Sequence, residues 1–226
     1  MSDAPDYGVA FRHWRNASPS WQAYAQHKFV NSLADGTLPL EAFLHYLKQD
    51  YVFLIHFSRA WALAVVKADT LSEMTTAAAT VNALVNEEMK LHVEICAKAG
   101  IAEATLEATE ERAENLAYTR YVLEAGYSGD LLDLLAALGP CVFGYGEIGL
   151  YCTKTRSSEN YSEWIDTYAG TDYQGVCTSV GELLDNALQR RLGDNFVDSP
   201  RFKQLTERFE TATRLEVGFW DMGLQP

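Results

Sequence analysis

The sequence lacks most of the features that mark secreted and membrane-spanning proteins. It has four cysteines in 226 residues, and no two of them form a Cys-x-x-Cys pair. Its first residues are polar and acidic, unlike those of a signal peptide. No apolar run approaches the roughly 20 residues that a membrane helix needs. These absences predict a reduced, cytoplasmic protein with free thiols and no membrane as a partner.

Basic residues are also scarce. The chain has 18 Lys and Arg against 31 Asp and Glu, a formal charge of −13, and no basic cluster beyond pairs such as Arg190-Arg191. Proteins that bind nucleic acids usually carry a basic patch or stripe, so we expect no nucleic-acid partner. Glycine-rich phosphate loops are missing as well, and this absence argues against a bound nucleotide.

The histidines do not follow a metal-binding pattern. The stretch from Glu87 to His92 places Met89 at i−3 from His92, whereas di-iron bundles use Glu-x-x-His. None of the remaining histidines forms a His-x-x-x-His or a paired Glu-x-x-His arrangement. We therefore expect no metal and no cofactor.

Strand signals are absent, and apolar residues recur at helical spacing instead. The pattern predicts an all-α bundle of seven or eight helices in a single domain over residues 1–226, with residues 1–7 as a loose N-terminus. Thr70 to Glu73 matches a capping box, and Ser199-Pro200 matches a helix start. The expected helices cover about residues 18–30, 40–67, 71–98 (closed by Gly100), 110–125 (ending at Gly126), a stretch around 131–138, a short helix around 164–168, 173–192 and 200–220.

The segment Leu138-Gly139-Pro140-Cys141 is the first candidate for chemistry. Proline lacks a backbone N–H, so the helix must kink or restart here. After a restart, Cys141 would lie beside unpaired N–H groups that favour a thiolate. Tyr145, at i+4, would share its helix face. The alternative is a small buried cysteine at a kink.

Two carboxylates stand in apolar surroundings. Asp50 lies between Leu47 and Leu54 on the buried stripe of its helix, where it needs either an internal donor or a ligand's donors. Phe53, at i+3, would face the same space. Glu216 precedes an aromatic pair, and its alternative is a place on a solvated helix face.

Taken together, these pieces resemble the TenA family, the thiaminase II enzymes of thiamin salvage. The resemblance is ordered over some 180 residues. Its pieces are Asp35-Gly36-Thr37-Leu38-Pro39, Tyr46-Leu47-Lys48-Gln49-Asp50-Tyr51, Glu88 to His92 with Cys96 and Gly100-Ile101, Ala117-Tyr118-Thr119, Leu138-Gly139-Pro140-Cys141, Tyr145-Gly146-Glu147, Trp164-Ile165-Asp166-Thr167-Tyr168, and Glu216-x-x-Phe219-Trp220.

The resemblance implies a haem-oxygenase-like helical fold without haem, usually a homotetramer. It implies conversion of 4-amino-5-aminomethyl-2-methylpyrimidine to the hydroxymethyl compound plus ammonia, with slow cleavage of thiamin, through a cysteine thiolate adduct. The matched positions, with their implied roles, are Cys141 as nucleophile, Glu216 as acid/base, Asp50 as the carboxylate that holds the ring, and Phe53, Tyr118, Tyr145 and Tyr168 as substrate-binding aromatics.

Two other functions stay open at this point. One is an oxidase or oxygenase on the same fold, which would want clustered His and Glu ligands. The other is a non-catalytic pyrimidine-binding or regulatory protein. Cys141 favours the cysteine-dependent hydrolase over both.

Overall fold

The computed structural model describes residues 4–226, which contain helices and no strand. The all-α expectation is confirmed. Two compact units make up the chain: the first comprises the residues up to Leu38 together with Leu135–Val217, and the second comprises Pro39–Leu134 together with Gly218–Pro226. The single-domain organisation stays a prediction.

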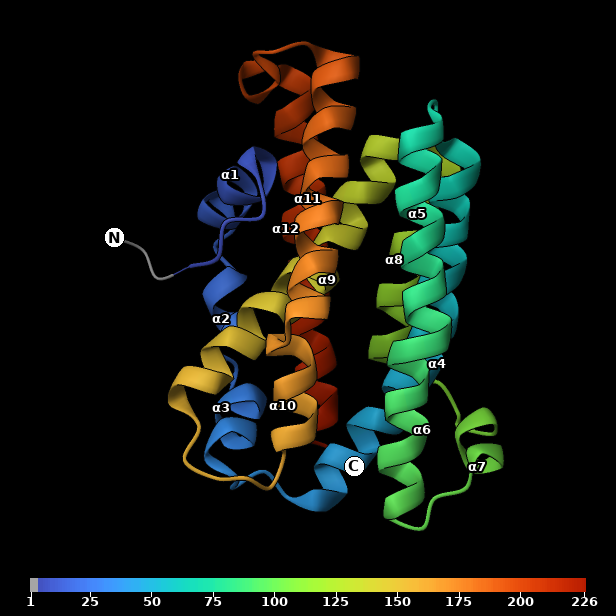
Figure 1. The fold of residues 1–226 in the computed structure, drawn as a ribbon, viewed down its shortest axis with the longest axis vertical. Coiled ribbons are helices and arrows are strands. Elements are labelled where there is room, and N and C mark those ends of the chain that lie inside the picture. The colour runs from blue at the N-terminus through green and yellow to red at the C-terminus, as the bar shows by residue number, and fades with distance from the viewer. Residues whose placement is uncertain (1–3) are drawn as a thin grey trace. The chain divides into compact units, whose positions relative to one another are not determined.

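The first unit packs short N-terminal helices with long C-terminal ones (Figure 1). Its core is aromatic: Trp14 and Trp21 both pack on Phe209, and Phe11 packs on Phe143. Its elements are α1 (Val9–Ala17), α2 (Trp21–Ala25), α3 (Lys28–Asp35), most of α9 (Leu131–Thr155), α10 (Ser162–Ala169), α11 (Thr171–Leu192), a 3-10 turn (Phe196–Asp198) and most of α12 (Pro200–Gly223).

The N-terminal segment differs from the expectation. α1 was not predicted, and α2 and α3 replace the single helix expected over residues 18–30. Tyr7 is 5% exposed, and its hydroxyl donates to Gln174 Oε1 at 2.6 Å. The expected loose end therefore does not extend to Tyr7, and residues 1–3 lie outside the described residues. The backbone N–H groups of Val9 and Ala10 donate to Asp185 of α11, so a distant carboxylate caps α1.

The second unit is built on α4 (Leu40–Lys67), which runs beside its other long helices (Figure 1). The bounds of α4 match the prediction, and the helix begins directly after Pro39, its N-cap residue. The other elements are α5 (Leu71–Ala83), a π-helix (Leu84–Glu88), α6 (Met89–Lys98), α7 (Glu103–Glu107) and α8 (Ala113–Ser128).

Local signals in the second unit are largely confirmed. Thr70 and Glu73 form the predicted capping box at the start of α5. Gly100, with a φ of 80°, follows the end of α6 in the conformation expected of a helix stop. Gly126, however, lies inside α8. A side-chain carbon there would come 2.6 Å from Leu63 Cδ2, so this glycine permits close helix packing.

α9 is continuous through Pro140, so of the two alternatives, a kink or a restart, the restart of the helix is wrong. All residues from Leu131 to Gly146 are buried. Their packing keeps the helix intact although Pro140 has no N–H group to donate a helical hydrogen bond. By length and composition alone, α9 could also cross a membrane, which the sequence analysis did not anticipate. The apolar window is wholly buried, however, as in the core helix of a soluble protein.

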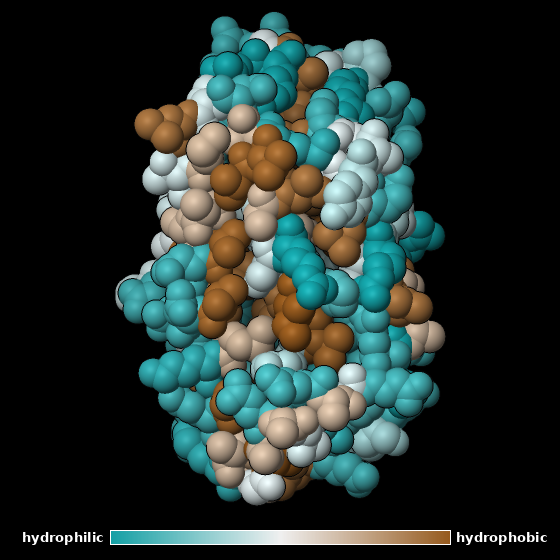
Figure 2. Space-filling view, turned by 90° about the vertical axis from the view of Figure 1, so that its right-hand side faces the viewer, coloured by the Kyte–Doolittle hydropathy of each residue, from teal (hydrophilic) through white to brown (hydrophobic). Residues whose placement is uncertain are grey.

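The face of the second unit around α5 exposes apolar side chains among polar ones (Figure 2). Val66, at the end of α4, and Leu71, at the start of α5, are each 78% exposed. Single exposed apolar residues are ordinary on protein surfaces. Val66 and Leu71 flank the same turn, between α4 and α5, so mutagenesis can test whether this surface is a contact.

Candidate active site

Cys141 lies in the interior of α9 and is 6% exposed. Because the helix does not restart at Pro140, Cys141 is not at a helix N-terminus. The explanation of a thiolate by unpaired N–H groups is therefore wrong for this chain. The carbonyl of Pro140 accepts a hydrogen bond from the Tyr24 hydroxyl at 3.3 Å, which ties α9 to α2 beside the cysteine. The role of Cys141 as a nucleophile stays a prediction.

Tyr145, one turn after Cys141, belongs to an aromatic cluster with α10. Its ring centroid lies 5.0 Å from that of Tyr168 and 5.9 Å from that of Trp164. Gly149 lets α10 approach closely, because a side-chain carbon at Gly149 would lie 2.5 Å from the Tyr168 carbonyl carbon. α9 and α10 thereby bring two of the predicted substrate-binding tyrosines together.

Glu216 lies in α12 and is 2% exposed, so the alternative of a solvated helix face is wrong. Thr213, one turn earlier, is fully buried and donates its hydroxyl to the carbonyl of Phe209. Glu216 and Cys141 are thus both buried within the first unit, and the acid/base role of Glu216 stays a prediction.

Asp50, in α4 of the second unit, meets internal donors. His92 Nε2 lies 2.6 Å from Asp50 Oδ2, and the Tyr46 hydroxyl donates to the same oxygen at 3.0 Å. Asp50 is 3% exposed, while His92 and Tyr46 are fully buried. The structure therefore confirms the first alternative for Asp50, an internal donor. Both internal donors bond Oδ2, so the other carboxylate oxygen can still accept a hydrogen bond from a ligand.

His92 follows the π-helix that joins α5 to α6. Its Nδ1 lies 2.8 Å from the carbonyl oxygen of Glu88, the last residue of that π-helix. Burial lowers the pKa of His92, but the hydrogen bond to Asp50 and the charges of Asp50 and Glu88 outweigh it, so the net pKa is raised. π-helices occur frequently at functional sites.

Phe53 lies one turn after Asp50 and packs against Tyr118 of α8. Their ring centroids are 5.1 Å apart, and Phe219 lies 5.5 Å from Phe53 in an edge-to-face arrangement. A small gap beside Phe53, lined also by His56, Phe57, Thr119 and Val122, is too small for a water molecule. This gap is no substrate cavity.

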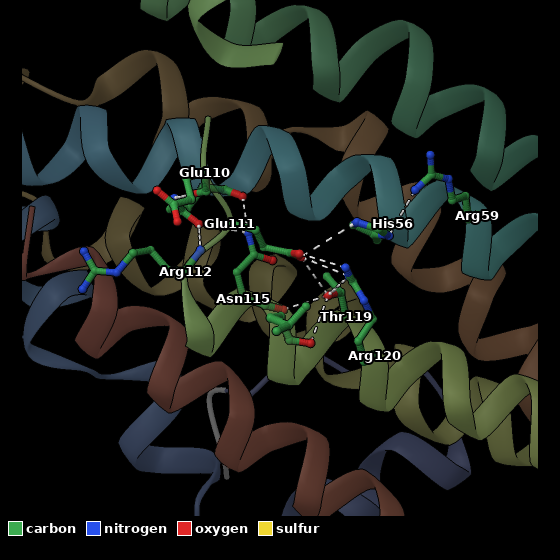
Figure 3. Close-up of polar contacts among 10 residues, drawn as sticks. His56, Arg59, Glu110, Glu111, Arg112, Asn115, Thr119 and Arg120 are labelled. Carbon is green, nitrogen blue, oxygen red and sulfur yellow. Dashed lines mark hydrogen bonds and ion pairs between the residues drawn. The ribbon is translucent and has the colours of Figure 1, made fainter. Parts of the chain in front are cut away.

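Polar contacts join α4 to α8 and to the segment that leads into α8 (Figure 3). Gln49 of α4 donates to the carbonyl of Glu110 at 2.8 Å, and it accepts from the N–H of Arg112 at 3.0 Å. Asn115 of α8 donates to the Gln49 carbonyl at 2.7 Å. These bonds fix the segment that leads into α8 and thereby set the position of Tyr118.

A second group of contacts lies farther along the same two helices (Figure 3). Glu111 accepts two hydrogen bonds from Arg120, at 3.0 and 2.8 Å, and its carboxylate lies 3.8 Å from His56. Burial, together with the positive charges of Arg120 and Arg59, lowers the pKa of His56.

The predicted site residues fall into two groups. The first unit contains Cys141, Tyr145, Tyr168 and Glu216, and the second contains Asp50, Phe53 and Tyr118. His92 and Tyr46 were missed as site residues. Both lie inside the family-like pieces of sequence, but helical spacing gives no sign that a histidine 42 residues away bonds Asp50. Within residues 4–226, no three His, Cys, Asp or Glu side chains converge as metal ligands would.

Comparisons with known proteins agree with these motifs. The family model TENA/THI-4/PQQC matches residues 14–226. The chain is 35% identical to an aminopyrimidine aminohydrolase of Halalkalibacterium halodurans, over 92% of each chain. It is 42% identical to an uncharacterized protein of Haemophilus influenzae, over 93% of this chain and 96% of that one.

Solved structures give the same result. The crystal structure of a TenA family transcription regulator from Silicibacter sp. TM1040 superposes with a TM-score of 0.97, at 65% identity and full coverage of both chains. The family model spans the ordered motifs around Asp50, Cys141 and Glu216. The chain therefore belongs to the TENA/THI-4/PQQC family, as the resemblance implied.

Proposed function

We propose that the protein is a hydrolase of thiamin salvage that converts 4-amino-5-aminomethyl-2-methylpyrimidine to the hydroxymethyl compound plus ammonia, and cleaves thiamin slowly. The observation that carries this proposal is the burial of all three reactive side chains, Cys141, Asp50 and Glu216, at 6%, 3% and 2% exposure. Buried polar groups of this kind are expensive to keep and are commonly functional. The relative from H. halodurans, an aminopyrimidine aminohydrolase, supports the same reaction.

The proposed chemistry begins at the sulfur of Cys141. Its thiolate adds to ring carbon C6 while a ring nitrogen takes up a proton, and the ring becomes an enamine that pushes electrons toward the C5 methylene. Glu216 protonates the amine, which leaves as ammonia. Glu216 then takes a proton from water, the hydroxide adds to the exocyclic methylene, and loss of the thiolate and the ring proton restores aromaticity. Water is consumed and ammonia released, so atoms balance.

The aromatic and acidic residues have binding roles in this proposal. Asp50 accepts from the N–H groups on the amino side of the ring. Phe53, Tyr118 and Tyr145 supply walls for stacking, whereas the phenol of Tyr168 hydrogen-bonds a ring nitrogen. Phe53 stacks only, because it has no hydroxyl group. Their aromatic contacts within each unit hold these rings in fixed orientations.

Ammonia release from the aminomethylpyrimidine tests the proposal directly. We expect turnover by the purified protein and a loss of at least about a thousandfold in kcat for Cys141→Ser. Cys152→Ser is the matched control, because Cys152 is a buried thiol of the same helix whose only role here is structural. Full activity of Cys141→Ser would exclude the covalent route. Absence of turnover by the wild-type protein would exclude the hydrolase.

A regulatory role is the second candidate, since the Silicibacter relative is described as a transcription regulator. The formal charge of −13 makes direct contact with a nucleic acid unfavourable. A fluorescence anisotropy titration with duplex DNA at low salt would reveal such contact, and we expect none. We further propose that the protein is cytoplasmic, in line with its four free cysteines, and that it forms a homotetramer, as the family resemblance implies.

A further inference from the structure

We propose that His92 and Tyr46 are positioning residues that hold Asp50 as a carboxylate and occupy one of its two oxygens, so that Asp50 contacts its ligand through Oδ1 alone. This inference rests on the proposed function, because it takes Asp50 to be the group that meets the pyrimidine. It adds two residues and a restriction on how the ligand is held.

The hydrogen bonds of His92 define its protonation. Nδ1 faces the carbonyl of Glu88 at 2.8 Å, and a carbonyl only accepts, so Nδ1 carries a hydrogen. Nε2 faces Asp50 Oδ2 at 2.6 Å, a short contact of the kind that hydrogen bonds with a charged partner make. This pair shares one proton, and the proposal assigns it to Nε2, so that both ring nitrogens of His92 carry a hydrogen. The charged groups that act on His92 are Asp50 of α4 and Glu88 of the π-helix.

Tyr46 completes the coordination of Oδ2. Its hydroxyl, one turn before Asp50 on α4, donates to Oδ2 at 3.0 Å. A carboxylate oxygen has two lone pairs, and the donors from His92 and Tyr46 use both on Oδ2. No donor among residues 4–226 bonds Oδ1, which therefore keeps its full capacity to accept.

The environment makes this arrangement rigid. His92 is 0% exposed, and Tyr46 packs against Trp220 with ring centroids 5.2 Å apart. The π-helix from Leu84 to Glu88 fixes the carbonyl that holds Nδ1. Asp50 therefore lacks the freedom to turn both oxygens toward a ligand.

The consequence concerns the ligand. A carboxylate with two free oxygens would grip an exocyclic amino group and a protonated ring nitrogen side by side. With Oδ1 alone available, these two N–H donors must share one oxygen, or one of them must find another acceptor.

The charge state is tested on the unliganded protein, independently of any activity. In a 15N NMR spectrum of protein labelled on histidine, we expect both ring nitrogens of His92 to show the shifts of N–H groups at pH 8. His92→Gln identifies the signal. A His92 signal typical of a neutral ring at pH 8 would overturn the inference.

The positioning role is tested by the binding of the product, 4-amino-5-hydroxymethyl-2-methylpyrimidine, measured by calorimetry in a double-mutant cycle. His92→Gln keeps a donor toward Asp50 and removes the charge, and we expect about ten- to hundredfold weaker binding. In an Asp50→Asn background the same change should have almost no further effect. His45→Gln, the same substitution at a buried histidine of α4, is the control for unspecific damage.

The outcomes separate the two proposals. Equal effects of His92→Gln with and without the Asp50 carboxylate would show that His92 does not act through Asp50, and the inference would fail. If the wild-type protein neither binds nor converts the pyrimidine, the proposed function fails, while the NMR result on His92 still stands. The inference is supported in full if the cycle shows strong coupling between His92 and Asp50 and the NMR spectrum shows both ring nitrogens of His92 protonated.

Discussion

The carboxylate of Asp185 is predicted to stabilise the N-terminal helix from a position far along the chain. Oδ2 accepts from the Val9 N–H at 2.7 Å, and Oδ1 accepts from the Ala10 N–H at 2.9 Å. Loss of a helix cap costs up to about 2 kcal/mol, and hydrogen bonds to charged groups are worth about 1.5–3 kcal/mol. For Asp185→Ala we expect a loss of about 2–4 kcal/mol, since both bonds serve the same cap.

Thermal unfolding monitored by circular dichroism measures this loss. At about 2–4 °C per kcal/mol for a chain of this size, Tm should fall by about 4–16 °C. Asp185→Asn keeps one acceptor and should lose about half as much. Asp6→Asn is the control at the same end of α1, because Asp6 pairs with Arg12 at an exposed site, and it should cost less than about 1 kcal/mol.

Hydrogen exchange supplies the decisive result. The amides of Val9 and Ala10 should exchange faster in Asp185→Ala, because their acceptors are gone. If the Tm of Asp185→Ala and the exchange of both amides match those of Asp6→Asn, the Asp185 carboxylate does not stabilise α1 and the reasoning is refuted.

Three further predictions concern the second unit. Thr70→Ala removes the capping box of α5 and should lower the free energy of unfolding in urea by about 1 kcal/mol, whereas Thr75→Ala, at an exposed interior position of the same helix, should change it by less than about 0.5 kcal/mol. Burial lowers the pKa values of His45 and His56 below 6.5, so the unfolded state binds more protons than the folded state. The free energy of unfolding should therefore fall as the pH drops below about 6.5. In the His45→Gln/His56→Gln double variant, the urea midpoint should change less between pH 7 and pH 5 than in the wild-type protein. Leu71→Glu, at a 78% exposed apolar position, should shift the proposed homotetramer toward smaller species in light scattering, and an unchanged mass would exclude this surface as a subunit contact.

Local sequence signals predicted the fold well wherever the determinants are local. The bounds of α4 follow from its apolar spacing, and the starts of α5 and α12 follow from Thr70 and Ser199, whose side chains accept from the N–H groups three residues on. α1 was missed because its cap is Asp185 and its first residue follows a glycine with a φ of 127°. Neither feature leaves a pattern in the neighbouring sequence.

The candidate site was predicted in part, for a similar reason. Burial of Asp50 and the packing of Phe53 followed from their places on an apolar stripe. The restart at Pro140 was wrong because burial of the whole helix outweighs one missing hydrogen bond. The partner of Asp50, His92, lies on another helix, and only three-dimensional structure reveals such a pair.

The non-contiguous cap of α1 bears on how the chain acquires its structure during synthesis. Val9 and Asp185 are 176 positions apart, so the first helix made leaves the ribosome long before its acceptor exists. Its apolar residues, Phe11 and Trp14, must wait for Phe143 and Phe209 in the same way. Pairings this distant in sequence slow folding and expose nascent chains to aggregation, so chaperone dependence should concentrate on the N-terminal segment.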